Sequence, residues 1–505
     1  MHKIKQQYQR LNKLQKVIFW IIFAVLIFFL LIALINIPIS LGYAGIKLKA
    51  ITWQTFSTAY AEDICFKISA IIAIIVVIVF AGGIGYQKWQ HFDMFAYEQK
   101  KKANRKEQEF KQIPQNNLLK LNKNFGLIKS NLTQHTLLVG TTGSGKTTTL
   151  MQIIKALRFK FRETTIIIDG KGDVDLIGKV KQLDPNAFIW EIGGETEYNP
   201  FANKNKVILA DKIMSLFDFS EQYYQNLAHN YLLLLLDTLL KNDIAITFDN
   251  LVKYFPIKQL EKLITFNDNS LSLLSNFDEK DINGLFNQLN VYNTQLNASL
   301  GNNNNLLELI TNHKTILFSI NSLMYPKLAG SVGKIIIQDL KELTTLKPVN
   351  QKINIVLDEF NVFASETIIN LINKSRSFNY QCFLSFQTIN DLKTNNMNLT
   401  DTIFGNVSTI VCHNIKDPNT AEYVASVFGT QETEKLTRQL DFKNNTADMG
   451  SVRAVDEFIV HPNDLKTLKI GECYLKTTLP SGKLFIKKIQ VDPTCLDGLI
   501  QHLNK

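Results

Sequence analysis

The stretch Gly140-Thr141-Thr142-Gly143-Ser144-Gly145-Lys146-Thr147 has the spacing G-x-x-x-x-G-K-[ST] of a phosphate-binding loop. A short apolar run, residues 136–139, precedes it, and apolar residues at helical spacing follow it from Thr148 to Leu157. A phosphate loop requires this order of strand, glycine loop and helix, because backbone N–H groups and the positive helix N-terminus then face the phosphates. The sequence therefore predicts a site for a nucleoside triphosphate.

The residue types in the loop suit this chemistry. Glycines adopt backbone torsions that other residues resist, so successive N–H groups can turn inward. Lys146 is expected to neutralise the β- and γ-phosphates, and the Thr147 hydroxyl is expected to bind Mg²⁺. The predicted nucleotide-binding residues are Gly140, Thr141, Thr142, Gly143, Ser144, Gly145, Lys146, Thr147 and Thr148.

A second motif follows much later in the chain. The apolar run 353–357 predicts a buried strand and ends in Asp358 and Glu359. We expect Asp358 to hold Mg²⁺, directly or through water, and Glu359 to orient and deprotonate the attacking water as a general base. A helix cap is the alternative role for Asp358. Four apolar residues before Asp-Glu are a weak signal alone, but the phosphate loop upstream makes the pair specific.

Other apolar runs predict the rest of an α/β sheet. They are residues 164–169, 188–190, 315–320, 381–387 and 409–412, and residues 328–346 predict a helix. Asp169 and Lys171 follow the first of these strands and are expected at the carboxyl edge of the sheet, beside the nucleotide. A plain polar turn explains these two residues equally well.

Two further polar residues are candidates for catalysis. Gln387 ends a predicted strand and is expected to sense the γ-phosphate. Arg376 lies in the preceding helix and is expected to reach the nucleotide of a neighbouring subunit, as an arginine finger does. A solvated surface arginine is the alternative for Arg376.

The N-terminal part predicts a membrane anchor. Residues 1–16 are polar and basic, and apolar runs follow at about 17–38 and 68–86, each long enough to cross a bilayer. Both outer flanks are more basic than the loop between the runs, which predicts that both termini lie in the cytoplasm. A cleaved signal peptide fits less well, because no convincing small-x-small site follows the first run.

Composition adds weaker constraints. The chain has 505 residues, enough for several domains, and a formal net charge of +10, which suits nucleic acid or anionic lipid without choosing between them. Its five cysteines, Cys65, Cys382, Cys412, Cys473 and Cys495, are scattered. Their spacing predicts neither a zinc site nor a disulfide framework, as expected in a reducing cytoplasm.

The order of these features resembles the type IV coupling proteins (the TraG/TraD family) of bacterial conjugation and type IV secretion. The resemblance covers nearly the whole chain and rests on a membrane hairpin followed by a series of motifs. These motifs are Gly140 to Thr147, Ile168 to Asp173, Asn199-Pro200, a helical insertion, Leu357 to Phe360, Ser385 to Gln387, Phe404 to Asn406, and Phe458 to Tyr474.

The resemblance implies an α/β fold, with a RecA-like P-loop motor whose central sheet is mostly parallel, an inserted all-α domain and a two-helix transmembrane hairpin. It implies a homo-hexamer in the inner or plasma membrane, with the motor in the cytoplasm. The expected activity is ATP- and Mg²⁺-dependent pumping of single-stranded DNA, bound to a relaxase within its relaxosome, into a type IV secretion channel. Lys146, Thr147, Asp358, Glu359, Arg376 and Gln387 match the motor residues of the family.

The predicted domains follow from the same order. They are a basic N-terminus (1–16), a transmembrane hairpin (17–87), a basic linker or stalk (88–125), the first part of the nucleotide-binding domain (126–205), an all-α domain (206–305) and the second part of the nucleotide-binding domain (306–505). Two other functions remain open. One is an FtsK-like pump for double-stranded DNA, and the other is a docking scaffold that uses ATP only for assembly.

Overall fold

The computed structural model describes residues 94–217, 219, 221–264, 270–348, 350–362, 366–393, 398–438 and 450–497. Nearly all of them belong to one compact unit that begins at Gln99. The N-terminus 1–16 and the predicted membrane spans, 17–38 and 68–86, lie outside the described residues. Within the described part, no helix has both the length and the apolar character needed to cross a bilayer.

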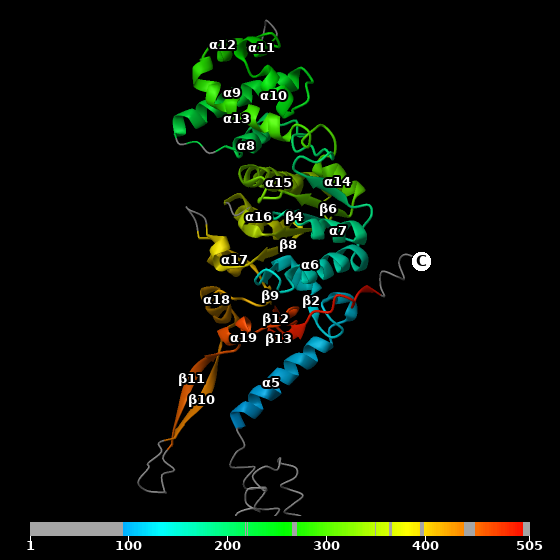
Figure 1. The fold of residues 1–505 in the computed structure, drawn as a ribbon, viewed down its shortest axis with the longest axis vertical. Coiled ribbons are helices and arrows are strands. Elements are labelled where there is room, and N and C mark those ends of the chain that lie inside the picture. The colour runs from blue at the N-terminus through cyan, green and yellow to red at the C-terminus, as the bar shows by residue number, and fades with distance from the viewer. Residues whose placement is uncertain are drawn as a thin grey trace, which may run out of the picture. The chain divides into compact units, whose positions relative to one another are not determined.

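A large sheet organises this unit (Figure 1). Among the described residues it has nine strands, in the spatial order β13 (Leu484–Gln490), β12 (Glu472–Thr478), β9 (Thr409–Cys412), β3 (Thr136–Val139), β8 (Tyr380–Phe386), β7 (Ile353–Asp358), β4 (Thr164–Asp169), β6 (Thr315–Ser319) and β5 (Phe188–Glu191). The seven strands from β9 to β5 pair in parallel, and β12 and β13 add two antiparallel strands at one edge. The predicted mostly parallel sheet is therefore confirmed, and the ends of its seven parallel strands differ from prediction by one residue at most.

The sheet is covered on both faces, which explains why its strands are continuous apolar runs rather than alternating ones. On one face Ile167 packs in a cluster with helices α6 (Lys146–Lys155) and α7 (Val174–Leu183). Its neighbours Ile166 and Ile168 point to the other face, into a cluster with α15 (Pro326–Leu346) and α16 (Glu366–Ser375). Because side chains alternate along a strand, a single run supplies both cores.

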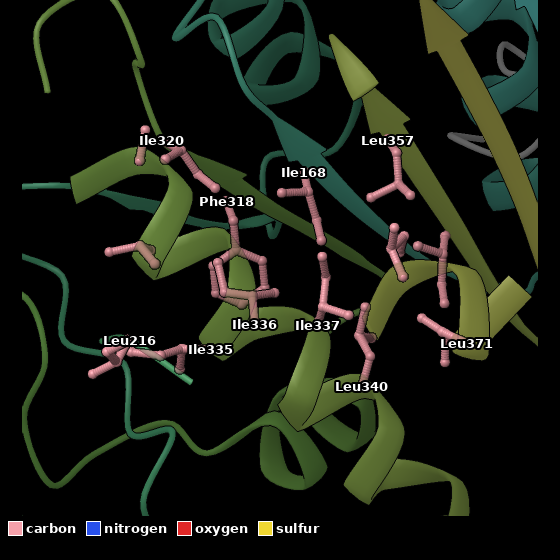
Figure 2. Packing of buried hydrophobic residues seen from close by; sticks show 14 of the residues in the cluster. Ile168, Leu216, Phe318, Ile320, Ile335, Ile336, Ile337, Leu340, Leu357 and Leu371 are labelled. Carbon is pink, nitrogen blue, oxygen red and sulfur yellow. The ribbon is translucent and has the colours of Figure 1, made fainter. Parts of the chain in front are cut away.

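Figure 2 shows the second of these cores. The α15 residues Ile336, Ile337 and Leu340 lie over Ile168, Phe318 and Leu357 of β4, β6 and β7. Leu216, which follows α8, reaches the same cluster from beyond α15. The helix α15 is thus buried between the sheet and the helical insertion, and the two parts share one continuous core.

The segment between β5 and β6 is helical within its described residues. Its helices are α8 (Lys206–Met214), α9 (Gln222–Lys241), α10 (Phe248–Tyr254), α11 (Ile257–Glu261), α12 (Ser270–Leu274), α13 (Glu279–Leu296) and α14 (Leu306–Asn312). The helices α8 to α13 gather into one group (Figure 1), and α14 leads back to β6. Leu232, Leu235 and Leu239 of α9 are buried in this group, as their helical spacing predicts.

The remaining elements lie outside the sheet's parallel part. They are α5 (Met94–Lys111), β1 (Leu118–Lys120), β2 (Gly126–Ile128), α17 (Thr400–Asn406), α18 (Pro418–Phe428), β10 (Thr430–Arg438), β11 (Gly450–Phe458) and α19 (Pro462–Lys466). The strands β10 and β11 pair over nine residues as an antiparallel ribbon. The sequence did not predict this ribbon, because β10 has only one apolar residue among nine and charged residues interrupt the apolar ones of β11.

Candidate nucleotide-binding site

The loop between β3 and α6 adopts the geometry that its glycines permit. Gly143 and Gly145 have φ angles of 76° and 106°, in the left-handed region, and α6 begins directly at Lys146. A Cβ on Gly145 would lie 2.9 Å from the backbone nitrogen of Gly471, whose N–H donates to the Ser144 carbonyl at 2.9 Å. The loop is therefore held from outside by the segment before β12, as well as by its own glycines.

Lys146 occupies the centre of the loop. Its ammonium group donates to the Gly140 carbonyl, which orients the side chain along the inner side of the loop. Burial lowers the pKa of Lys146, and the carboxylates of Glu359, Asp358 and Asp391 oppose this change. A buried ammonium group surrounded by carboxylates is suited to bind an anionic phosphate chain together with a metal ion.

The two carboxylates of the second motif lie at the carboxyl end of β7, on the strand next to β4. The Glu359 N–H donates to Asp358 Oδ1 at 3.2 Å, and Glu359 has a φ angle of 54°. Left-handed backbone at a residue other than glycine is uncommon, and such strain clusters at functional sites. Burial raises the pKa of Glu359, while the hydrogen bond from Gln387 and the charge of Lys146 lower it.

A hydrogen-bonded chain joins Glu359 to the phosphate loop. Gln387 Nε2 donates to Glu359 Oε1 at 2.8 Å, and Thr142 Oγ1 donates to Gln387 Oε1 at 3.0 Å. The backbone N–H of Gln387 in turn donates to Asp391 Oδ2 at 2.9 Å. Gln387 is thus fixed by its main chain and bridges the two motifs with its side chain.

The turn after β4 forms another wall of the site. Asp169 is fully buried, and its carboxylate accepts hydrogen bonds from the N–H groups of Lys171 and Asp173, at 2.9 and 2.7 Å. Burial raises the pKa of Asp169 to about 6, although those two N–H groups lower it. In the strand register Asp169 lies directly beside Asp358. The predicted position of Asp169 and Lys171 at the carboxyl edge of the sheet is therefore confirmed.

These elements enclose a cavity of about 220 Å³. Its lining includes two lysine ammonium groups, three carboxyl groups, the hydroxyls of four threonines and the backbone of the loop. The lining residues are Thr141, Thr142, Gly143, Gly145, Lys146, Thr147, Thr148, Lys171, Asp173, Asp358, Glu359 and Ile470. Oxygen donors from Thr147 and Asp358 suit Mg²⁺, and the cations and loop N–H groups suit phosphate. The residues present therefore fit a magnesium-bound nucleoside triphosphate.

Comparison with known protein families agrees with this geometry. Residues 123–487 match the family model described as the type IV secretion-system coupling protein DNA-binding domain. The match spans well over half of the chain. The chain belongs to this family. The matched segment contains every residue of the cavity, so the nucleotide-binding motifs lie within the part of the chain that defines the family.

Solved structures share the fold of this coupling protein at low sequence identity. The bacterial conjugative coupling protein TrwBdeltaN70, in its unbound monoclinic form, is 14% identical, with a TM-score of 0.55 over 77% of this chain and 91% of that chain. TrwB in complex with ADP and Mg²⁺ is 16% identical, with a TM-score of 0.50 over 73% and 87% of the two chains. These likenesses show a TrwB-like α/β fold, which fits a RecA-like nucleoside triphosphatase.

One curated relative covers a smaller part. An uncharacterised protein of Mycoplasma pneumoniae is 27% identical over 133 residues, which are 26% of this coupling protein and 86% of that relative.

The structure brings most of the predicted site residues together, but four of them do not line the cavity. Gln387 is one of these and lies beside the cavity, in the hydrogen-bonded chain described above. Gly140 and Ser144 do not line the cavity. Gly140 is packed against His413 and Ser144, and Ser144 is buried within the loop. Arg376 lies in a short 3₁₀ turn, Arg376–Phe378, just before β8. The start of β8 lies at the amino ends of the parallel strands, whereas the cavity lies at their carboxyl ends. Arg376 is exposed there and takes no part in the site of its own chain.

Sequence reasoning missed a histidine beneath the phosphate loop. His413 directly follows β9 and is fully buried. Its Nε2 is 2.9 Å from Thr149 Oγ1, and its Nδ1 is 3.1 Å from the Glu472 carbonyl. A Cβ on Gly140 would lie 2.7 Å from His413 Cβ, so the ring supports the base of the loop. A polar residue at the carboxyl end of a core strand was the one available signal.

Because His413 is buried as the neutral ring, acid should destabilise this coupling protein. Burial lowers the pKa of His413 from 6.5 to about 4. Because the pKa is lower in the folded state than in the unfolded state, neutral His413 contributes its full stability above about pH 6.5. That contribution is lost as the pH falls toward 4. At pH 5 the loss is about 2 kcal/mol. We expect the melting temperature of the wild type to fall more between pH 7.5 and 5 than that of His413→Gln. Parallel pH profiles for the two proteins would refute this assignment.

Proposed function

We propose that this coupling protein is a membrane-anchored ATPase that uses ATP hydrolysis to pump single-stranded DNA into a type IV secretion channel. The observation that carries the proposal is the convergence of Lys146, Thr147, Asp358 and Glu359 on one cavity, in a chain of the coupling-protein family. TrwB, whose fold this chain shares, binds ADP with Mg²⁺ and analogues of ATP and GTP, which adds support.

The hydrolysis step assigns a task to each side chain. Lys146 would hold the β- and γ-phosphates, with the loop N–H groups around them. Bound Mg²⁺ would supply neutralisation of phosphate charge, held by Thr147 and Asp358. Glu359 would accept the proton of the attacking water, and its raised pKa makes it a stronger base than an exposed glutamate. Gln387, bonded to Glu359 and Thr142, would register whether a terminal phosphate is present.

The proposed assembly is a ring of six identical chains. Arg376 is exposed at the amino ends of the parallel strands, on the side away from its own cavity, which leaves its guanidinium accessible to another chain. In a head-to-tail ring this side would face the next subunit's nucleotide, where an arginine stabilises transition-state charge. The apolar runs at 17–38 and 68–86 would anchor the ring in the inner or plasma membrane, with the motor in the cytoplasm. Relaxase-bound DNA and the channel proteins would be its partners.

DNA binding by such a motor should be electrostatic and favour single strands. The net charge of +10 suits contacts with phosphates, which make binding weaken steeply with salt. We expect the affinity of the full-length protein for an oligonucleotide to fall by at least about tenfold from about 50 to about 200 mM salt. Fluorescence anisotropy with single-stranded and duplex DNA of equal length measures both properties. Tighter binding of the duplex would favour the FtsK-like double-stranded DNA pump instead.

The docking scaffold is separated from the motor by Lys146→Ala. The motor requires hydrolysis for transport, so this variant should lose both ATPase activity and DNA transfer from cells that carry it. Lys179→Ala is the matched control, because Lys179 is an exposed lysine on α7 that pairs with Asp175 outside the cavity. If DNA transfer survives in Lys146→Ala while hydrolysis is lost, the protein acts as a scaffold.

A further inference from the structure

A second lysine reaches the nucleotide cavity from the turn after β4. Lys171 lines the cavity together with Lys146, Asp358 and Glu359. Its side chain is 55% exposed, and its Nζ lies 3.8 Å from Asp173 Oδ2, near the upper limit for an ion pair. An exposed pair at this distance contributes little to stability. Stability alone therefore gives no reason for a lysine at this position.

The turn that carries Lys171 is rigidly built. The buried Asp169 carboxylate accepts from the N–H groups of both Lys171 and Asp173. Gly172 between them has a φ angle of 72°, and a Cβ on it would lie 2.4 Å from the Cβ of Asn321. Neither the torsion nor the space allows another residue there. A buried carboxylate and a tightly packed glycine thus fix the direction in which Lys171 leaves the sheet.

The neighbouring strands hold the same turn in place. The Gly170 N–H donates to the Asp358 carbonyl at 3.2 Å, and the Ser322 N–H donates to the Gly170 carbonyl at 2.9 Å. The turn is therefore tied directly to the residue expected to bind Mg²⁺. Lys171 enters the cavity on the side of Asp358 and Glu359, which is the side where hydrolysis would take place.

Two ammonium groups in one cavity repel each other unless an anion lies between them. The charge of Lys171 is among the causes that lower the pKa of Lys146, after burial. A triphosphate supplies the negative charge that makes both positions favourable, and it extends one phosphate further than a diphosphate. The repulsion in the free protein and its relief on binding both favour the longer ligand.

We propose that Lys171 is a second phosphate-binding cation that contacts the terminal phosphate of the nucleotide. Asp169 is the positioning residue that holds its turn. This inference rests on the proposed ATPase function, because it requires a nucleoside triphosphate in the cavity. It makes the cavity selective for the triphosphate over the diphosphate product.

Titration of the full-length protein with a fluorescent non-hydrolysable ATP analogue and with fluorescent ADP, both with Mg²⁺, tests the proposal. Lys171→Ala should lower the affinity for the ATP analogue by about tenfold or more, and the affinity for ADP by less than about threefold. Lys171→Arg should restore most of the affinity, and Lys179→Ala should change neither ligand. Equal effects on both ligands, or no effect, would overturn the role of Lys171.

The positioning role has its own readout. Asp169→Asn should selectively lower the affinity for the ATP analogue, as Lys171→Ala does. In the double variant the loss of affinity should be little larger than in Lys171→Ala alone. Additive losses for both ligands would show a general structural role instead. Gly172→Ala is the second probe of the same turn, with its melting temperature measured to detect misfolding. If the wild type binds neither nucleotide, the proposed ATPase function fails along with this inference, whereas a wild type that binds both equally well refutes only the selectivity.

Discussion

Glu359→Gln is expected to abolish ATP hydrolysis, lowering kcat by about a thousandfold, while nucleotide affinity stays within about threefold of the wild type. The amide has the shape of the carboxylate and keeps an oxygen that accepts from Gln387 Nε2, so the hydrogen-bonded chain to Thr142 survives. It has no basic oxygen to take a proton from water. Single-turnover and steady-state ATPase assays, with a parallel binding titration, measure the two effects separately.

The control for this substitution is Glu195→Gln. Glu195 is an exposed glutamate in the turn after β5, outside the cavity, and its loss of charge should leave hydrolysis unchanged. If Glu359→Gln retains more than about a third of wild-type kcat, Glu359 is not the general base. If it loses nucleotide binding as well, the residue serves mainly to shape the site.

The second large effect is expected at Lys212, on α8 of the helical insertion. Its side chain is 2% exposed, and its ammonium group donates to Asp339 Oδ1, Glu342 Oε2 and the Pro200 carbonyl at 2.9, 2.7 and 2.6 Å. Both carboxylates belong to α15, and the Tyr198 hydroxyl donates to the other oxygen of Asp339. This buried network joins the insertion to the helix that packs on the sheet.

Lys212→Met should destabilise the protein by about 3–5 kcal/mol, because two buried carboxylates lose the cation that compensates them. Burial already raises the pKa of Asp339, and the charge of Lys212 opposes that rise. The expected result is a melting temperature lower by several degrees and faster proteolysis within residues 206–296. The triple variant Lys212→Met, Asp339→Asn, Glu342→Gln should recover much of the loss, since it leaves no buried charge unpaired. A melting temperature within about 1 °C of the wild type would show that the network does not hold the insertion.

The sequence predicted the parts of the fold that depend on local pattern. The strands at 164–169, 353–358 and 409–412 are runs of β-branched and other apolar residues that both faces of the sheet bury. The phosphate loop needs its glycines at fixed spacing, and the structure places Lys146 and Glu359 around one cavity as predicted. Contacts of this kind follow from the strand order of the fold, and a few motif residues are enough to indicate that fold.

What the sequence did not predict depends on contacts between distant segments. His413 supports the phosphate loop only because β9 pairs with β3. Gly471 approaches Gly145 because β12 adds to the edge of the same sheet. Lys212 has the sequence appearance of a surface lysine, and its burial follows from how α8 packs on α15. No local pattern distinguishes such residues from solvated ones.

In the proposed motor, DNA drives the ATPase cycle of this coupling protein. The most direct test measures ATP hydrolysis by the full-length protein in detergent or nanodiscs, with and without single-stranded DNA, beside Glu359→Gln. We expect strong stimulation by DNA in the wild type and none in the variant. A wild type that binds ATP and single-stranded DNA, yet hydrolyses ATP at the same rate with and without the DNA, would contradict the motor and favour the docking scaffold.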